Sequence, residues 1–394
     1  MTWTQRFWLA LLALAAPSFA LARDNITINA QSEGQSASRG FSSVDQIFNS
    51  LSTSTLSNSL PGYTSNSAAT AQFDLRGVPA LASFAANSSA LRVQIPAANG
   101  LDRVFEGNTR EESARLFQRF MQGSNGSASL NALLRAGTHS SPIDPISGGP
   151  NSALTQLAVS DFARSVQGSL GDRTGFGIGA RVGSFSAAGY DSWNVTAPID
   201  ASFRLSERDT LSFDAPFAYT NAGGATSYSG NIGALYRRRV LENWDLQASG
   251  RLGAAGSINL GAGSAIFGLG LASTLRLPIS ESWRLTIVNG LNYVSTLPSS
   301  IGKAAVDYSV ANTIFRNGLI LTRATGLSLA GFPLALSFYA VDTRFAGSPV
   351  FVRNFQEFGV FVSPGRESNF GFGLQVMTGD RGLFGVMVST GVKF

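Results

Sequence analysis

The sequence predicts an all-β transmembrane barrel of about 12 antiparallel strands, preceded by a small α+β N-terminal domain and a helix before the barrel. Apolar and polar residues alternate with a period of two from Gly175 to the C-terminus, which is typical of β-strands. Charged residues make up only 13% of the 394-residue chain, whereas about a quarter is usual in soluble domains. No apolar run beyond the N-terminus reaches the roughly 20 residues that a membrane-spanning helix needs. The alternating strands are therefore the expected membrane-spanning elements.

The final stretch, residues 382–394, alternates in this way up to the last residue. One face carries Phe384, Val386, Val388, Thr390, Val392 and Phe394, and the other carries Leu383, Gly385, Met387, Ser389, Gly391 and Lys393. A strand that ends the chain on an aromatic residue resembles the closing strand of Gram-negative outer-membrane β-barrel proteins. This resemblance implies that Phe394 and Val392 form the assembly signal, with the barrel-assembly machinery as a partner. It also implies that the protein is located in the cell outer membrane.

The first 22 residues read as a signal peptide. Arg6 supplies the positive charge, residues 7–16 form an apolar core too short to span a membrane, and Ala20-Leu21-Ala22 fits a cleavage site. Cleavage after Ala20 is the alternative. The chain has no Cys, so it can form no disulfide and has no thiol for catalysis.

Residues 23–59 are rich in Ser, Asn, Thr and Gln, and this composition predicts a flexible segment in which residues 44–48 could form a short helix. Residues 60–136 are predicted to form a small periplasmic α+β domain. Its strands are expected at 72–78 and 91–95, where apolar and polar residues alternate again.

The clearest helix of this domain is expected at residues 108–122, where Thr109 and Glu112 could form a capping box. Its apolar face predicts a domain core, with a docking surface for a partner as the alternative. This face consists of Leu116, Phe117, Phe120 and Met121. A shorter helix is expected at residues 130–134.

Residues 137–170 are predicted to be a linker followed by a plug or pore helix. The first part, 137–150, is rich in Gly, Pro and Ser. A helix is expected at 151–166, because Leu154, Leu157, Ala158, Phe162 and Val166 recur on one side. Two alternatives remain open: the helix lies inside or under the barrel mouth, or it only closes the preceding domain.

Residues 171–394 are assigned to the outer-membrane barrel. Strands before residue 300 and after residue 369 alternate regularly, whereas those near 305–322, 332–343 and 351–362 are less regular, so ten strands are the fallback count. Large aromatic residues on the apolar face lie towards strand ends, as in the aromatic girdles of membrane barrels. These expected membrane-interface residues are Trp193, Trp244, Trp283, Tyr228, Tyr236 and Tyr293.

The turns alternate between short charged ones, such as 206–209 and 279–282, and Gly-rich ones, such as 222–225. Short turns are typical of the periplasmic side. With an even strand number both barrel termini lie on that side, and a periplasmic N-terminal domain fits this arrangement.

The polar faces of the strands predict a charged lumen. The lumen-facing residues are expected to be Arg181, Asp200, Arg204, Asp214, Arg237, Arg239, Asp245, Arg251, Arg276, Arg284 and Lys393, with Asp307 and Glu357 less regular in their pattern. The surplus of Arg suggests a preference for anions. The alternative is that these charges pair across strands and only stiffen the wall.

Catalysis is not expected. The single His, His139, lies in the linker, whereas the known enzymatic families of outer-membrane barrels require a barrel His. We expect no catalytic residues, no metal site and no cofactor. The net charge of +5 is too modest and dispersed to indicate nucleic-acid binding.

The layout of signal, small domain, helix and barrel resembles two families. One comprises secretion pores with a periplasmic domain, and the other comprises autotransporters, whose translocator barrel follows a helix that runs through the pore. The preferred hypothesis is an outer-membrane channel or secretion pore with a periplasmic or plugging N-terminal domain. An autotransporter-like protein that translocates or anchors its N-terminal region at the cell surface is the alternative, and a structural anchor or adhesin is the third. Expected partners are outer-membrane lipid, the assembly machinery and an exported protein or small solute.

Overall fold

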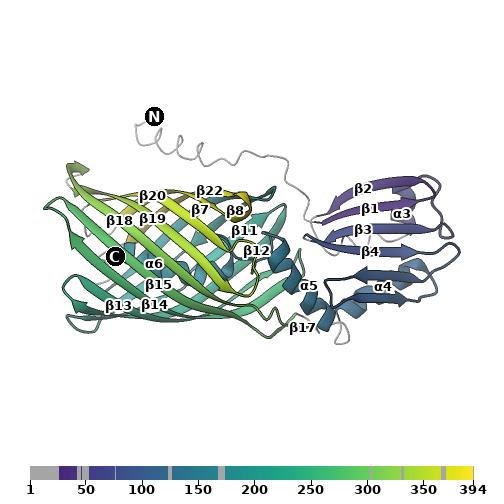
Figure 1. Ribbon diagram of the computed structural model, residues 1–394, viewed down its shortest axis with the longest axis horizontal. Helices are drawn as coiled ribbons and strands as arrows, with labels where there is room; N and C mark the ends of the chain where they lie inside the picture. The colour runs from purple at the N-terminus through teal and green to yellow at the C-terminus, as the bar shows by residue number, and fades with distance from the viewer. Residues whose placement is uncertain are drawn as a thin grey trace.

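A β-barrel and a smaller sheet domain lie end to end in the computed structural model (Figure 1). The structure describes residues 26–41, 46, 53–75, 77–122, 127–166, 174–301, 304–329, 332–364 and 370–393. Among these residues, no helix combines the length and the apolar composition needed to cross a membrane.

The barrel sheet closes on itself through twelve antiparallel strands, as predicted. Its segments are β7 (Gly175–Ala187), β8 (Tyr190–Ala197), β9 (Ile199–Arg204), β10 (Asp209–Asp214), β11 (Phe217–Ala222), β12 (Ala225–Leu241), β13 (Trp244–Ser257), β14 (Ala262–Pro278), β15 (Trp283–Leu297), β18 (Ala311–Leu329), β19 (Phe332–Gly347), β20 (Asn354–Pro364), β21 (Phe370–Gly379) and β22 (Leu383–Lys393). Segments β8 and β9 form one strand interrupted at Pro198, and β10 and β11 form one interrupted at Pro216, since proline cannot donate to the ladder. The last strand pairs with the first, with Val388 opposite Val182. A short hairpin, β16 (Ser299–Ile301) with β17 (Ala304–Val306), lies in the loop between β15 and β18, and the short helix η3 (Asp380–Gly382) joins β21 to β22.

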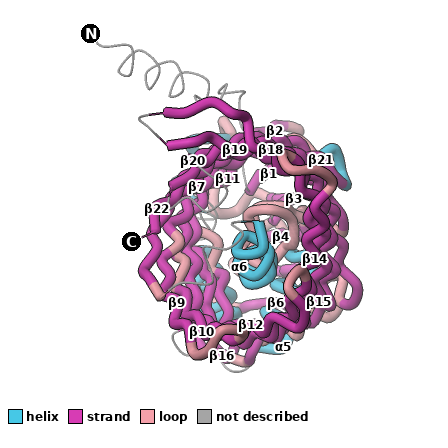
Figure 2. The backbone as a smooth tube through the Cα atoms, turned by 90° about the vertical axis from the view of Figure 1, so that its left-hand side faces the viewer, coloured by secondary structure: helices cyan, strands magenta, loops and turns pink. Residues whose placement is uncertain are grey.

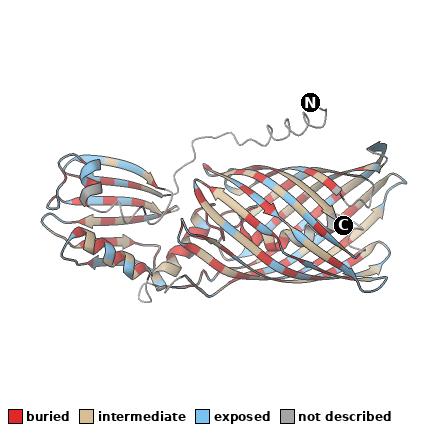
Figure 3. Cartoon of the chain, turned by 180° about the vertical axis from the view of Figure 1, so that it is seen from behind, coloured by how far each residue is buried: buried red, intermediate tan, exposed pale blue. Residues whose placement is uncertain are grey.

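Exposed and buried residues alternate along much of the length of the barrel strands (Figure 3). The outward residues are large and apolar: Ile232 is 67% exposed, Leu271 60% and Leu252 58%. Polar residues such as Asn292 and Thr274 are buried on the inward face. This inside-out pattern is stable only where lipid surrounds the wall, so the barrel lies in the outer membrane.

Several large inward side chains lie flat on the wall because glycine occupies the neighbouring strand. A Cβ added to Gly359 would overlap the ring of Tyr339, and one added to Gly371 would overlap the ring of Phe361. Phe185 lies over Gly385 in the same way. These rings therefore cover the wall and leave the middle of the barrel to another element.

The smaller domain contains a six-stranded antiparallel sheet in the order β2-β1-β3-β4-β5-β6. The strands are β1 (Ile26–Ser32), β2 (Gln35–Phe41), β3 (Ala69–Leu75), β4 (Val78–Phe84), β5 (Leu91–Ile95) and β6 (Leu101–Phe105). Three helices cover one face: α3 (Thr53–Ser59), α4 (Arg110–Gln122) and α5 (Ser127–Ser140). The opposite face is polar and carries the exposed residues Asn29, Gln72 and Arg92.

The expectation of a flexible segment at residues 23–59 is wrong for its described part. Residues 26–41 form a hairpin that joins the sheet, because Ile28, Ala30 and Phe41 all bury their side chains in the domain core. The polar residues between them occupy the exposed face, and a composition dominated by Ser and Asn hides this pattern. The predicted signal peptide lies outside the described residues, as does the predicted helix at 44–48 apart from Gln46.

Helix α4 forms where the helix at 108–122 was predicted, and its apolar face belongs to the core. The cap differs in detail from a capping box. Thr109 Oγ1 accepts a hydrogen bond from the Glu112 amide at 3.2 Å, but the Glu112 carboxylate accepts one from the Asn108 amide at 2.7 Å. Both bonds satisfy amides at the helix start that have no partner within the helix.

A single helix, α6 (Ala153–Val166), follows the domain and lies within the barrel (Figure 2). Of the two alternatives for the helix at 151–166, the structure shows the one in which it enters the barrel. The predicted Gly/Pro/Ser linker is not a surface linker. Residues 137–140 belong to α5, and residues 141–149 are buried apart from the half-buried Pro142.

Candidate functional site: the barrel lumen and its stem

The chain crosses the barrel from one mouth to the other before the first strand begins. Asn151, just before α6, donates a hydrogen bond to Ser192 near the turn between β7 and β8, whereas β7 itself starts at the opposite mouth. The N-terminal domain therefore sits at the mouth opposite to the barrel termini (Figure 1). The expectation that domain and barrel termini share one side is not met, because α6 carries the chain through the lumen.

Helix α6 leans on one wall of the lumen, against β12, β13, β14, β15 and β18. Its first turns are buried against the wall: Leu154 is 0% exposed and Leu157 2%. Gly268 on β14 makes room for the helix, because a Cβ there would lie 3.0 Å from Leu157 Cδ2. Helix α6 therefore packs closely against the wall at Gly268, where a larger residue would not fit.

The segment between α5 and α6, residues 141–152, fills the mouth next to the domain. Ile143 and Ile146 join a core that includes barrel residues such as Ile266 and Val294. Asp144 is 2% exposed, and its Oδ1 accepts a hydrogen bond from the Ile146 amide at 2.9 Å. We call residues 141–166, the mouth segment together with α6, the stem.

The lumen wall holds a first charge cluster on β10 and β12 to β14. Asp214 and Arg251 form a buried ion pair that passes over Gly233, where a Cβ would collide with both side chains. Asp245 is bound by Arg276 at 2.8 Å. It also lies 3.9 Å from both Arg237 and Arg239.

A second cluster connects β18, β19, β20 and β21. Arg316 forms an ion pair with Glu357 at 2.5 Å and donates a hydrogen bond to Thr343 at 2.8 Å. Gln375 donates to Glu357 at 3.1 Å and accepts from the Tyr339 hydroxyl at 2.8 Å. The bonds run along the wall, some between neighbouring strands and some across one intervening strand, as Arg316 on β18 reaches Glu357 on β20. This is the pattern expected for charges that stiffen the wall.

Arg316 was not among the predicted lumen residues because strand β18 looked irregular in the sequence. The structure shows the signal that could have found it: Phe315 and Leu319 point outward, so counting in twos places Arg316 inward. Asp307, in contrast, lies in the loop before β18 and not in the lumen.

The other predicted lumen residues lie on the inward-facing positions of their strands, with different surroundings. Arg181 and Asp200 are half-buried, as is Arg284. Arg204 is exposed near the mouth, where its Nε donates to the Ser206 carbonyl at 3.1 Å. The side chain of Lys393 and the whole of Phe394 lie outside the described residues.

The six predicted interface aromatics lie on the outward face near both barrel mouths. Tyr236, Trp244 and Trp283 lie near the barrel termini, and Trp193, Tyr228 and Tyr293 lie near the N-terminal domain. The four that are most exposed are Tyr228 at 50%, Tyr293 at 44%, Tyr236 at 39% and Trp193 at 37%.

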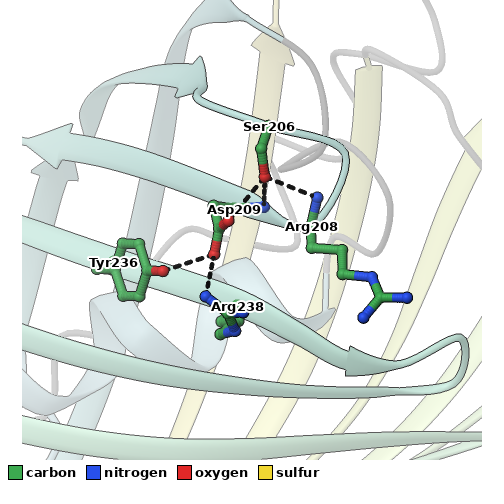
Figure 4. A network of polar contacts seen from close by, with 5 residues as sticks. All are labelled: Ser206, Arg208, Asp209, Tyr236 and Arg238. Atoms are coloured by element: carbon green, nitrogen blue, oxygen red, sulfur yellow. Dashed lines mark hydrogen bonds and ion pairs between the residues drawn. The ribbon is translucent and has the colours of Figure 1, made fainter.

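Polar contacts accompany the aromatic residues near the barrel termini (Figure 4). Tyr236 donates to Asp209 Oδ1 at 2.5 Å, and Ser206 donates to Asp209 Oδ2 at 2.7 Å. Arg238 approaches the same carboxylate at 3.4 Å. Tyrosine at this level combines an apolar ring in lipid with a hydroxyl in the polar interface.

Among the described residues, no group of three or more His, Cys, Asp or Glu side chains is placed to hold a metal ion.

No protein-family model and no curated protein matches the chain. Among solved structures it is similar to the β domain of the Bordetella autotransporter BrkA, with 15% identity, a TM-score of 0.44, and coverage of 57% of this chain and 100% of that one. It is similar to the translocator domain of autotransporter NalP from Neisseria meningitidis, with 14% identity, a TM-score of 0.44, and coverage of 61% and 97%. The COG4313 outer membrane channel from Pseudomonas putida F1 matches with 13% identity, a TM-score of 0.40, and coverage of 56% and 96%. At these identities the likeness concerns the fold alone.

Proposed function

We propose that this outer-membrane barrel anchors its own N-terminal domain at the cell surface, with the stem as the connection through the lumen. The observation that carries the proposal is the path of the chain: the domain and the barrel termini lie at opposite mouths, joined by α6. The barrel is therefore an autotransporter-like anchor whose cargo is part of the same chain. It has no catalytic role in this proposal.

The lengths of the connections support this orientation. Bacterial barrels have short periplasmic turns and longer extracellular loops. The longest connection in the barrel, residues 298–310, lies at the mouth with the N-terminal domain, whereas the turn at 242–243 is one of those beside the barrel termini. The domain expected in the periplasm is therefore assigned to the outside.

Protease treatment of intact cells tests the orientation. A protease site inserted at 85–87, in a turn of the N-terminal domain, should be cut on intact cells. The same site inserted at 242–243 should be cut only after the outer membrane is permeabilised. Protection of the first site together with cleavage of the second would place the domain in the periplasm and refute the proposal.

The preferred sequence hypothesis, an open channel or secretion pore, requires a free lumen. The stem fills the mouth beside the domain, so we expect the full-length protein to conduct little current in planar bilayers. Gly268→Val should displace Leu157 and increase the conductance, whereas Gly290→Val should not. A Cβ at Gly290 would make only ordinary contacts of 3.4 Å or more, none of them with the stem. High conductance of the unmodified protein would favour the channel instead.

A further inference from the structure

Two loops at the mouth next to the N-terminal domain close over the stem and the end of α5. The first, residues 298–310, buries the apolar side chains of its second half: Tyr308 and Val310 are 0% exposed and Val306 is 1% exposed. These side chains belong to the core that contains Leu134 of α5 and Ile143 of the stem. The apolar part of this loop therefore packs in a core that α5 and the stem share with the barrel wall.

Hydrogen bonds fix the same loop to α5. Asn131 Oδ1 accepts a bond from the Asp307 amide at 2.9 Å, and Arg135 Nε donates to the Tyr308 carbonyl at 3.1 Å. The base of the loop is held separately, because the Thr296 amide donates to the Val310 carbonyl at 2.9 Å. The anchored base at Val310 is bonded to the barrel without α5, whereas Asp307 and Tyr308 are bonded to α5.

The second loop, residues 348–353, pairs with the stem through the backbone. The Phe351 amide donates to the Ser147 carbonyl at 2.6 Å, and Gly148 forms a parallel bridge with Val352. Gly148 has a φ of +78°, and a Cβ there would lie 2.7 Å from the Val352 carbonyl oxygen. Glycine is thus required both by the backbone and by the close approach of the loop.

Helix α5 connects this mouth core directly to the domain core. Leu133 packs in the core of the N-terminal domain, and the next residue, Leu134, packs in the core of the barrel mouth. No free segment separates the two bodies at this helix. Fixing α5 at the mouth therefore fixes the orientation of the domain.

We propose that the loops 298–310 and 348–353 form a latch that closes on α5 and the stem and joins the N-terminal domain rigidly to the barrel. The latch becomes ordered when α5 and the stem reach the mouth, because α5 supplies hydrogen-bond partners for Asp307 and Tyr308 and the stem supplies the backbone partner of Val352. The N-terminal domain is then held in one orientation and is not tethered by a loose linker. This inference concerns the mouth alone and does not depend on the side of the membrane.

Thiol cross-linking of the purified full-length protein tests the first contact, since the chain has no Cys of its own. The pair Asn131→Cys and Asp307→Cys should cross-link rapidly with a short bifunctional thiol reagent. Adding Tyr308→Ala should slow this cross-linking, and a pair of Asn131→Cys with Asn259→Cys, in another loop of that mouth, serves as the control. Equal rates for the two pairs would overturn the latch.

Limited proteolysis of residues 141–152 tests the second contact. Gly148→Ala should speed cleavage about tenfold, because the backbone bond to the loop is lost. Gly261→Ala is the matched control: Gly261 also has a positive φ, +57°, but a Cβ there would meet nothing within 4 Å. Equal cleavage of both variants would show that the loop does not hold the stem. Since the protein is purified, this failure would leave the surface-display test on cells untouched.

Discussion

The N-terminal domain and the barrel use the same alternation of apolar and polar residues with opposite results. In the domain, Leu91 is 0% exposed and Val93 2%, while the polar residues between the core positions face water. In the barrel, Leu271 is 60% exposed, whereas Thr274 on the inward face of the same strand is 1% exposed. The difference teaches that a period of two identifies a strand but does not say which face is inside. The medium around the sheet decides this.

Strand length distinguishes the two regions. Strand β5 of the domain has 5 residues, whereas β12 of the barrel has 17. A tilted strand needs about 9–11 residues to cross the hydrocarbon layer. Long strands with an unbroken apolar face therefore indicate lipid, and short strands with the same pattern indicate a water-soluble sheet.

The largest effects should come from placing arginine on the apolar face of each region. Leu91→Arg puts a charge into the domain core and should cost more than about 4 kcal/mol, which unfolds the domain. Leu271→Arg, at an exposed position, should cost about 2–4 kcal/mol because the residue faces lipid. Barrel folding can be followed by Trp fluorescence, since Trp193, Trp244 and Trp283 all lie in the barrel.

Domain folding can be followed by protease resistance of residues 26–140 in the same samples. Gln72→Arg, on the exposed polar face of the domain, is the control and should change neither signal. If Leu271→Arg were equally harmless, the outward face would not be in lipid and the contrast between the regions would fail.

A smaller effect is expected from ion pairs in the two regions. Asp214→Ala removes the carboxylate that pairs with the buried Arg251. It should lower the free energy of unfolding of the barrel by about 3 kcal/mol, measured in urea. Asp102→Ala removes an equivalent partner from Arg92, but that pair is on the surface and the domain should unfold almost as before. A larger loss at Asp102 than at Asp214 would contradict the assignment of the charges to a closed lumen.

Alkaline pH should affect the domain through Tyr63. Burial raises the pKa of Tyr63, although a hydrogen bond from Arg110 at 2.6 Å lowers it in part. The pKa of Tyr63 is higher in the folded than in the unfolded domain. The neutral Tyr63 therefore makes its full contribution to the free energy of unfolding below about pH 10, and this contribution is lost as the pH rises through the folded pKa. Protease resistance of the domain should therefore fall above pH 10. In Tyr63→Phe, protease resistance should fall less between pH 8 and the same alkaline pH.

The smallest effect is expected from Asp102 at acid pH. Two hydrogen bonds from Arg92, at 2.7 and 2.8 Å, lower the pKa of this carboxyl group. A lowered folded pKa contributes stability above the ordinary value near pH 4, and this is lost as the pH falls through the folded pKa. The small difference between the wild type and Asp102→Asn should therefore disappear near pH 2. A difference that grows with acidity would show that the pair does not stabilise the folded domain.

The regular strands were predictable because lipid tolerates no interruption of an apolar face. Strands β18 to β20 were harder to delimit, since β18 carries a register shift between Ala324 and Ser328 and places Arg316 inward. The hairpin formed by β1 and β2 was missed because few apolar residues stand among Ser and Asn. In each case the strand is stabilised by pairing with another strand, and the local alternation of apolar and polar residues does not show this pairing.

The side on which the domain lies could not be deduced from chain order. A domain that precedes the first barrel strand in the sequence is expected at the mouth where that strand starts. Helix α6, however, has 14 residues and is about 21 Å long. This length carries the chain through much of the lumen and places the domain at the far mouth. The alternating pattern of the strands does not predict where α6 lies. Its position depends on the close contact between Leu157 and Gly268.

Because Leu133 and Leu134 of α5 belong to two different cores, a mechanical load on the domain meets no hinge within α5. Force applied to the N-terminal domain would pass along α5 into the loops that end β15 and β19, and from there into the closed hydrogen-bond ladder. A closed ladder distributes shear over all its strands. The joint is therefore stiff at α5, and a pulling force on the domain is transmitted directly to the barrel.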